Sequence, residues 1–203
     1  MRVVVVRTGE VDGVMPKRGI RVITGEVKGL RLRTPPRGAA RPTSDLVRSA
    51  IFSMLESMGV PFDRVVDLYA GTGALGIEAL SRGAGEADFV ERDARMAAVI
   101  RENLKAAGFV ERTHVYAGGV ARAAAFLTGP YNVVFMDPPY ADARRDEVIG
   151  QVLKSGLVGP RTAVVVEHAH RRPLPEAMDG FSAVRQRRYG ATAITIYRKE
   201  DVE

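Results

Sequence analysis

Cysteine and tryptophan are absent from this chain of 203 residues, and histidine occurs only three times. Without cysteine, disulfides and thiolate metal sites are excluded. His114, His168 and His170 lack the spacing of metal ligands, so the sequence predicts no metal site. The longest apolar runs fall far short of the roughly 20 residues that span a membrane, and the run Val3–Val6 is too short for the core of a signal peptide. We therefore expect a cytoplasmic protein with no membrane contact.

The chain does have enough apolar content for a full core and an excess of positive charge. Hydrophobic residues make up 46% of the sequence, and its length fits one α/β domain with a small appendage. The formal net charge of +6 favours an anionic partner, with nucleic acid as the first candidate. We expect a monomer.

From residue 64 onward, short apolar runs alternate with segments of helical periodicity. This alternation predicts right-handed βαβ units and a mostly parallel, seven-stranded sheet with helices on both faces. The expected strands are 64–68, 87–90, 114–117, 133–136, 162–167, 181–188 and 191–198, the last two forming an antiparallel pair. The expected helices are 75–82, 95–107, 122–127 and 142–154.

The chain before this alternation is basic and contains several glycines and prolines. Residues 21–33 predict a small β-hairpin with basic residues on one face. The hydroxyls that precede Asp45 predict the start of a helix, whose apolar stripe runs from Leu46 to Leu55. We therefore divide the chain into an N-terminal extension with its hairpin, residues 1–40, and a main domain, residues 41–203.

A glycine-rich turn, Gly71-Thr72-Gly73-Ala74-Leu75-Gly76, follows the first strand of the alternation and opens a helix. Glycines let the backbone bend sharply and let a ligand approach it closely. Glu91 ends the next strand, where an acid can accept hydrogen bonds from a ribose diol. The glycine pattern alone also fits a dinucleotide enzyme, which holds a pyrophosphate at the helix N-terminus, or a tight turn without a ligand.

Asp67, directly before this turn, favours a different cofactor. A carboxylate there would repel a pyrophosphate and would pair with an ammonium group. S-adenosylmethionine (AdoMet) carries an ammonium and a sulfonium and no phosphate, so we expect AdoMet. The residues predicted to bind it are Asp67, Tyr69, Ala70, Gly71, Thr72, Gly73, Glu91, Arg92 and Gly119.

The tetrapeptide Asp137-Pro138-Pro139-Tyr140 directly follows the apolar strand 133–136. If the carboxylate of Asp137 and the carbonyl of Pro138 each accept a hydrogen from an arylamine, the nitrogen is drawn toward tetrahedral geometry. Its lone pair can then attack a methyl group positioned in line. Asp137 can accept the released proton, the two prolines stiffen the loop, and Tyr140 can stack on an extruded base. Taken alone, the tetrapeptide would also serve as a turn that ends a strand.

Together these residues resemble the RsmD family of bacterial small-subunit rRNA guanine-N2 methyltransferases, from about residue 21 to residue 198. The matching segments are Arg21-Val22-Ile23-Thr24-Gly25, Lys28-Gly29, Arg41-Pro42-Thr43, Arg48, Ile51-Phe52, the run from Asp67 to Ala84, Val90-Glu91, Asp137-Pro138-Pro139-Tyr140 and Tyr189-Gly190.

The resemblance implies a Rossmann-like class I AdoMet-dependent methyltransferase fold. It also implies methylation of the guanine N2 amine in 16S rRNA, on the small ribosomal subunit or an assembly intermediate. The segment 117–121 lacks the acid that often contacts the adenine in relatives, so either the main chain or another side chain must make that contact. Ala191 stands where relatives often carry an acid.

The region from Lys17 to Arg48 contains nine basic residues and two acidic ones. Such a surface would neutralise RNA phosphates, although a basic run can also be a solvated face without a partner. The residues predicted to bind RNA are Arg21, Lys28, Arg31, Arg33, Arg41, Thr43 and Arg48. A second basic cluster, Arg185, Arg187 and Arg188, is open to either interpretation.

Three alternatives remain at this stage. An adenine-N6 methyltransferase shares Asp-Pro-Pro-Tyr, but it normally needs a target-recognition segment longer than any stretch available here. A non-catalytic RNA-binding ribosome-assembly factor would not need an intact tetrapeptide. A nucleotide-dependent oxidoreductase would need a substrate domain.

Overall fold

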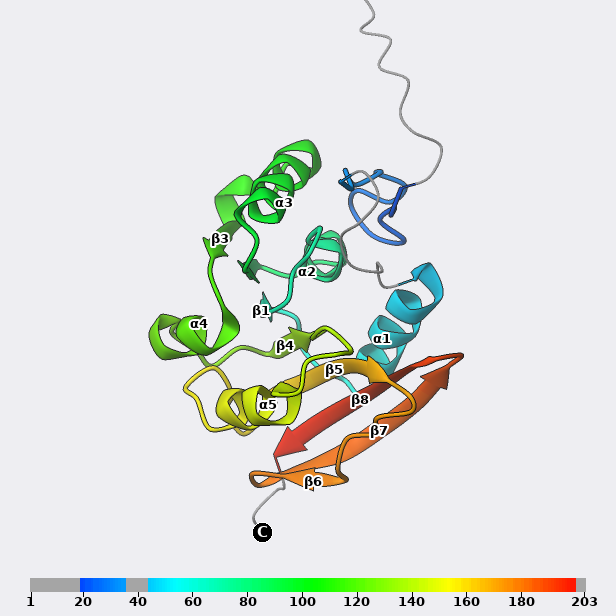
Figure 1. Ribbon diagram of the computed structural model, residues 1–203. Helices are drawn as coiled ribbons and strands as arrows, with labels where there is room; N and C mark the ends of the chain where they lie inside the picture. The colour runs from blue at the N-terminus through cyan, green and yellow to red at the C-terminus, as the bar shows by residue number, and fades with distance from the viewer. Residues whose placement is uncertain (1–18, 36–43, 200–203) are drawn as a thin grey trace, which may run out of the picture.

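The computed structural model describes residues 19–35 and 44–199, which form one sheet flanked by helices (Figure 1). The strands lie in the order β3-β2-β1-β4-β5-β8-β7-β6. Their bounds are β1 Arg64–Asp67, β2 Glu86–Glu91, β3 Thr113–Ala117, β4 Val133–Met136, β5 Ala163–Ala169, β6 Ala177–Met178, β7 Phe181–Tyr189 and β8 Thr192–Lys199.

The first five strands are parallel, and β8, β7 and β6 continue the sheet in antiparallel fashion. Along β4, Val133 and Phe135 face one hydrophobic cluster while Val134 and Met136 face the other. Both faces of the central strands are therefore covered, which explains their continuous apolar sequences.

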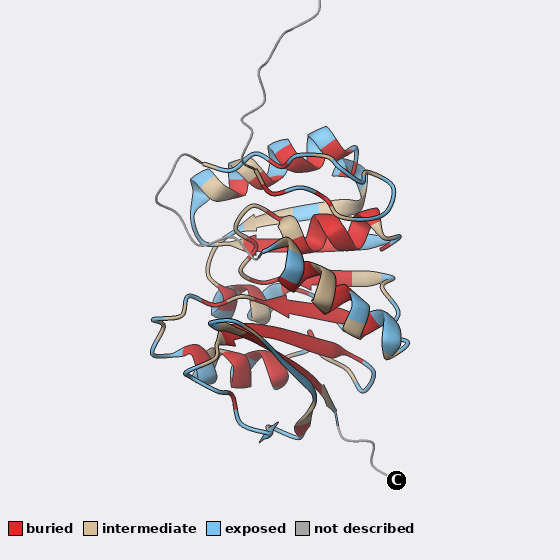
Figure 2. Ribbon diagram, turned by 90° about the vertical axis from the view of Figure 1, so that its right-hand side faces the viewer, coloured by how far each residue is buried: buried red, intermediate tan, exposed pale blue. Residues whose placement is uncertain are grey.

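The helices form two layers, one on each face of the sheet (Figure 2). The first cluster includes residues of α1 Asp45–Ser57, α2 Ala74–Ser81 and α3 Ala94–Ala107, and the second includes residues of α4 Val120–Phe126 and α5 Arg145–Leu153. A short 3-10 helix, Val110–Arg112, follows α3. Among the described residues, no helix is long and apolar enough to cross a membrane.

Local signals set the helix ends as the sequence predicts. The Ser44 side chain accepts a hydrogen bond from the main chain of Val47 at the start of α1, next to Asp45 in the first turn. Gly108 ends α3 in the left-handed conformation, with φ of 75°.

The predicted sheet is confirmed with one correction: it has eight strands rather than seven. The additional strand, β6, pairs only with Phe181 and Ser182 of β7. Two paired residues leave no periodic pattern in a sequence, which is why it was missed.

The predicted hairpin at residues 21–33 is present in a short, irregular form. Arg21 and Arg31 make a single antiparallel bridge, flanked by main-chain hydrogen bonds from Val22 N to Leu30 O and from Leu32 N to Ile20 O. The N–H groups near its tip bond to α2. Glu78 accepts from Ile23 at 2.7 Å and from Thr24 at 3.0 Å, and Ser81 accepts from Glu26 and Val27. We call residues 19–35 the N-terminal segment.

The N-terminal segment contributes Ile20, Val22 and Leu32 to the cluster that it shares with α1, α2 and α3. The division of the chain near residue 40 stays a prediction. The expected strand Val3–Val6 and the RNA-binding candidates Arg41 and Thr43 lie outside the described residues.

Candidate active site

Three acidic residues meet where neighbouring parallel strands end. Asp67 ends β1 and pairs in register with Phe89 of β2 and Phe135 of β4. Glu91 and Asp137 therefore each lie two residues beyond the position opposite Asp67. The glycine loop and the Asp-Pro-Pro-Tyr loop emerge side by side at the carboxyl edge of the sheet, the edge where open α/β sheets bind ligands.

The glycine loop needs its glycines for conformation and for space. Gly71 and Gly73 have φ of 53° and 80°, in the left-handed region. A Cβ on Gly73 would also lie 3.2 Å from Ile100 Cγ2. The N–H of Gly71 donates to Glu91 Oε2 at 2.8 Å, so the predicted ribose-binding acid is held against the loop.

Asp67 is 2% exposed and is not matched by a cation among the described residues. Oδ2 of Asp67 accepts a hydrogen bond from Gly76 N at 3.2 Å. Oδ1 is buried and accepts no hydrogen bond of normal geometry from residues 19–35 or 44–199. Burial raises the pKa of Asp67 to about 7, and the N–H groups of Gly76 and Tyr69 offset this only in part. Such an arrangement suits a positively charged ligand group that binds against Oδ1.

Tyr69, directly before the glycine turn, is within electrostatic range of the chain that follows the Asp-Pro-Pro-Tyr loop. Burial raises its pKa to about 12, and Asp142, which follows that loop, adds to the rise.

Asp137 is half-buried, Pro138 buried and Pro139 exposed, so the acid at the start of this loop is partly accessible to solvent. The Tyr140 hydroxyl lies 2.8 Å from Thr192 Oγ1 and 3.3 Å from Glu167 Oε1. Burial raises the pKa of Tyr140, so the phenol stays neutral and its ring is fixed at the hydroxyl end.

Sequence reasoning missed the residues that brace this loop. Arg172 Nη1 donates to the carbonyl of Tyr140 at 2.8 Å, and Thr192 and Glu167 hold the phenol. The braces come from β5, β8 and the connection after β5. No local pattern could have revealed them because the contacts span 27 to 52 residues of sequence.

Asn103 of α3 is a further residue that the sequence did not single out. Its Oδ1 accepts from Arg33 N at 2.7 Å, and its Nδ2 donates to Thr72 O at 2.9 Å. One buried side chain thus joins the N-terminal segment to the glycine loop.

The predicted adenine-side residue, Gly119, is the N-cap of α4 and lines a pocket of about 300 Å³. The neighbouring Gly118 N–H donates to Glu91 O at 2.9 Å, which brings this turn beside the end of β2. Arg92 is exposed next to Glu91. Other residues that line the pocket are Val90, Tyr116, Ala117, Arg122 and Phe126.

Four predicted RNA-binding residues, Arg21, Lys28, Arg31 and Arg33, are exposed on the N-terminal segment. Two of them have acidic neighbours: Arg21 pairs with Asp45 at 3.0 Å, and Arg33 pairs with Glu102.

Arg48 requires a correction, because it is 1% exposed and faces the interior. It donates to the carbonyl of Arg21 and to Asp45 Oδ1. Arg48 therefore anchors the N-terminal segment to α1 and lies away from any surface that RNA could reach. No group of three or more His, Asp or Glu side chains in residues 19–35 and 44–199 could hold a metal ion.

Similarity to known proteins identifies the family of this chain. The family described as "Conserved hypothetical protein 95" matches residues 20–198. The chain belongs to this family. The match confirms the resemblance to RsmD, since ribosomal RNA small subunit methyltransferase D of Escherichia coli is 32% identical over 181 residues, covering 89% of this chain and 90% of that protein.

Two further relatives agree with the family assignment. YlbH of Bacillus subtilis, named as a candidate rRNA methyltransferase, is 35% identical over 89% of this chain and 99% of its own. The solved structure of the Escherichia coli protein yhhF, described as a candidate methyltransferase, is 30% identical and superimposes with a TM-score of 0.77 over 90% of this chain and 99% of its own. This chain is therefore an RsmD-family protein with a methyltransferase fold.

Proposed function

We propose that this protein transfers a methyl group from AdoMet to the N2 amine of a guanine in 16S rRNA. The proposal combines the rRNA methyltransferase names of the relatives with the three acids that the strand register brings to the carboxyl edge of the sheet. We also propose that the protein acts as a monomer in the cytoplasm, on the small subunit or an assembly intermediate.

The observation that carries the cofactor assignment is the buried Asp67 whose Oδ1 is left for a cation. Asp67 would hold the ammonium group of AdoMet. The glycine loop, Tyr69 and Ala70 to Gly73, would surround the methionine end, and Glu91 with Arg92 would bind the ribose. Gly119 and the pocket between β3 and α4 would bind the adenine. Main-chain groups and apolar side chains of this pocket would then take the place of the acid that segment 117–121 lacks.

AdoMet supplies an activated methyl group. Asp137 Oδ and the Pro138 carbonyl would each accept one hydrogen of the guanine amine, so that its lone pair faces that methyl. When bound, AdoMet would supply this methyl group with sulfur as the leaving atom, which would keep the electron pair of the broken bond. Asp137 would accept the proton released from the amine nitrogen. Pro139 stiffens the loop, and Tyr140, held by Thr192 and Glu167, would stack on the base.

RNA binding is proposed for the exposed residues of the N-terminal segment, Arg21, Lys28, Arg31 and Arg33, together with Arg41 and Thr43. Their charges would neutralise phosphates and position the RNA without reading its sequence. Asn103 hydrogen-bonds both to this segment and to the glycine loop. The same side chain would therefore help to position the RNA-binding residues and the AdoMet-binding loop.

The experiment is to compare 16S rRNA from a strain that lacks this protein with rRNA from its parent, by mass spectrometry of nuclease fragments. We expect the loss of one 2-methylguanine, restored by the wild-type gene and not by Asp137→Ala. Loss of a methyl from an adenine would instead favour an amine methyltransferase with another target. Unchanged rRNA modification would overturn the proposed substrate.

A further inference from the structure

The outer part of β7 carries three arginines within four residues, Arg185, Arg187 and Arg188, and the strand contains no acid. All three are exposed. We call them the β7 strip. They come from a strand near the edge of the sheet, far in sequence from the N-terminal segment.

The charges of the β7 strip are not neutralised by the described residues. Arg185 donates to the carbonyl of Val184 at 2.8 Å, Arg187 to that of Gln186 at 3.0 Å, and Arg188 to that of Gly190 at 3.0 Å. None of the ion pairs found in residues 19–35 and 44–199 includes any of the three. Because a guanidinium has five donors, each side chain keeps most of its hydrogen-bonding capacity.

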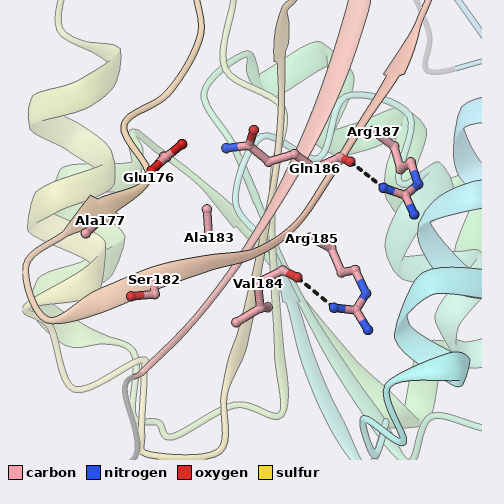
Figure 3. Close-up of a pocket in the computed structure, with 8 residues that line it drawn as sticks. All are labelled: Glu176, Ala177, Ser182, Ala183, Val184, Arg185, Gln186 and Arg187. Atoms are coloured by element: carbon pink, nitrogen blue, oxygen red, sulfur yellow. Dashed lines mark hydrogen bonds between the residues drawn. The ribbon is translucent and has the colours of Figure 1, made fainter.

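The edge of β7 beside the strip is also open. The short β6 covers only Phe181 and Ser182, leaving a polar groove of about 730 Å³ along the strand. In Figure 3 the one acid of this groove, Glu176, lies on the opposite side of β7 from the guanidinium groups of Arg185 and Arg187. The groove therefore does not supply a partner for the strip.

One end of the β7 strip lies at the mouth of the active site. Tyr189 of β7 pairs with Thr192 of β8, and Thr192 Oγ1 lies 2.8 Å from the hydroxyl of Tyr140. Arg188 pairs with the next residue of β8, Ala193. From there the strip runs away from the mouth for about 10 Å, at roughly 3.3 Å per residue.

Part of the β7 strip lies on the face of the sheet that the N-terminal segment covers. Tyr189 packs with the cluster that includes Ile20, Val22 and Leu32 of the N-terminal segment. Side chains two apart on a strand share a face, which places Arg185 and Arg187 on the side of Tyr189 and Arg188 on the other. In Figure 1 helix α1 lies between the N-terminal segment and the β7–β8 hairpin.

We propose that the β7 strip is a second phosphate-binding site for the substrate RNA, on the other side of the catalytic mouth from the N-terminal segment. The inference rests on the proposed function, because it takes the polyanion to be the RNA that carries the target base. Two basic sites on either side of the mouth would hold the RNA strand before and after that base. A base extruded between two fixed stretches of backbone reaches Tyr140 and Asp137 at a lower entropic cost.

The test uses a full-length triple variant, Arg185→Gln, Arg187→Gln and Arg188→Gln. The matched control, Lys105→Gln, Arg161→Gln and Lys199→Gln, removes the same charge from exposed positions outside β7, namely on α3, before β5 and at the end of β8 that is farther from Thr192. Binding of 16S rRNA transcribed in vitro is measured over a range of KCl concentrations, and methyl transfer at single turnover. Calorimetry with AdoMet checks the cofactor site, and thermal melting checks the fold.

We expect the triple variant to bind the RNA about fivefold to tenfold more weakly than the control at 0.15 M salt. We also expect its salt dependence to flatten by about 0.7–0.9 in log–log slope for each lost phosphate contact. AdoMet affinity should match that of the wild type, and an Arg→Lys triple variant should recover most of the RNA affinity.

Equal RNA affinity and equal salt slope in the triple variant and the control would overturn the inference, even with methyl transfer intact. If instead the wild-type protein binds AdoMet but transfers no methyl group to rRNA, the proposed function fails first, and the strip loses its assigned partner with it.

Discussion

Two buried aspartates on neighbouring strands of the same sheet have opposite surroundings. Asp88 of β2 is 6% exposed and accepts from the Tyr131 hydroxyl at 2.5 Å, with His114 Nδ1 at 3.1 Å and Arg64 at 3.6 Å. Asp67 of β1 is 2% exposed, accepts from the main-chain N–H of Gly76, and among the described residues has the Glu91 carboxylate near it and no cation partner. The Asp88 carboxylate has hydrogen-bond and ion-pair partners within the protein, whereas Asp67 has no cation partner among the described residues.

The difference follows from where each aspartate lies along its strand. Asp88 lies toward the amino end of β2, where Arg64 and Tyr131 are in reach. Asp67 is the last residue of β1, at the edge where the loops open. Burying an acid without a cation partner costs stability, and this cost is the physical ground for the proposed ligand-binding role of Asp67.

The largest expected effect comes from removing the third acid at the carboxyl edge. Asp137→Ala should lower the rate of methyl transfer at least hundredfold. The guanine amine would lose a hydrogen-bond acceptor, and the proton released in the reaction would lose its base. Single-turnover transfer of labelled methyl to rRNA measures the rate, and calorimetry should show AdoMet affinity within about twofold of wild type. Unchanged turnover would remove Asp137 from the chemistry.

The second effect isolates the unpaired aspartate. Asp67→Asn should weaken AdoMet binding about a hundredfold, since the ammonium loses a buried counter-charge. The same change should stabilise the ligand-free protein at pH 8 by about 1–2 kcal/mol, because no buried charge remains. Calorimetry and thermal melting report the two quantities. A loss of stability would show that Asp67 is a structural acid after all.

The reverse is expected for the paired aspartate. Asp88→Ala should destabilise the fold by about 2–3 kcal/mol, because Tyr131 and Arg64 lose their common acceptor. That corresponds to a drop in melting temperature of roughly 4–12 °C for a domain of this size. AdoMet affinity, measured on the folded protein, should stay at the wild-type value. If Asp88→Ala weakened AdoMet binding as much as Asp67→Asn does, the two aspartates would not have different roles.

AdoMet binding should depend on pH through the protonation of Asp67. With a pKa near 7, Asp67 is protonated below neutral pH and must release that proton to pair with an ammonium. The dissociation constant for AdoMet should therefore rise about tenfold for each pH unit below about 7. In the ligand-free protein the sign is opposite: since the pKa is raised on folding, the contribution of this group to stability falls as pH rises from about 4 to about 7.

Asp67→Asn is the control for this pH series, because its AdoMet affinity should vary little between pH 5 and 8. A parallel pH profile in the variant would assign the titration to another group.

The smallest effect concerns the support of Tyr140. Thr192→Val removes the hydroxyl partner at 2.8 Å, so we expect methyl transfer to slow severalfold with AdoMet affinity unchanged. Tyr140→Phe should act similarly, and the double variant should be no worse than either single one. Additive losses would mean that the two hydroxyls act independently.

Strong local patterns made much of the fold predictable. Alternating strands and helices gave the parallel sheet, and Gly108 and Ser44 mark helix ends that the structure confirms. The hairpin at residues 21–33 is shorter than predicted, with a single bridge, because Glu78 and Ser81 of α2 take the N–H groups near its tip. The roles of the site residues toward AdoMet and RNA stay predictions.

The sequence by itself determined the parts whose chemistry is local. Asp67 before a glycine turn, Glu91 at a strand end and Asp-Pro-Pro-Tyr after another are each read within a few residues. Only the tertiary structure decided which charges are free to act. It buried Arg48, linked Arg33 to Thr72 through Asn103, and completed Asp88 while leaving Asp67 without a cation among the described residues. Burial and pairing depend on contacts between distant segments, and periodicity along the chain carries no record of them.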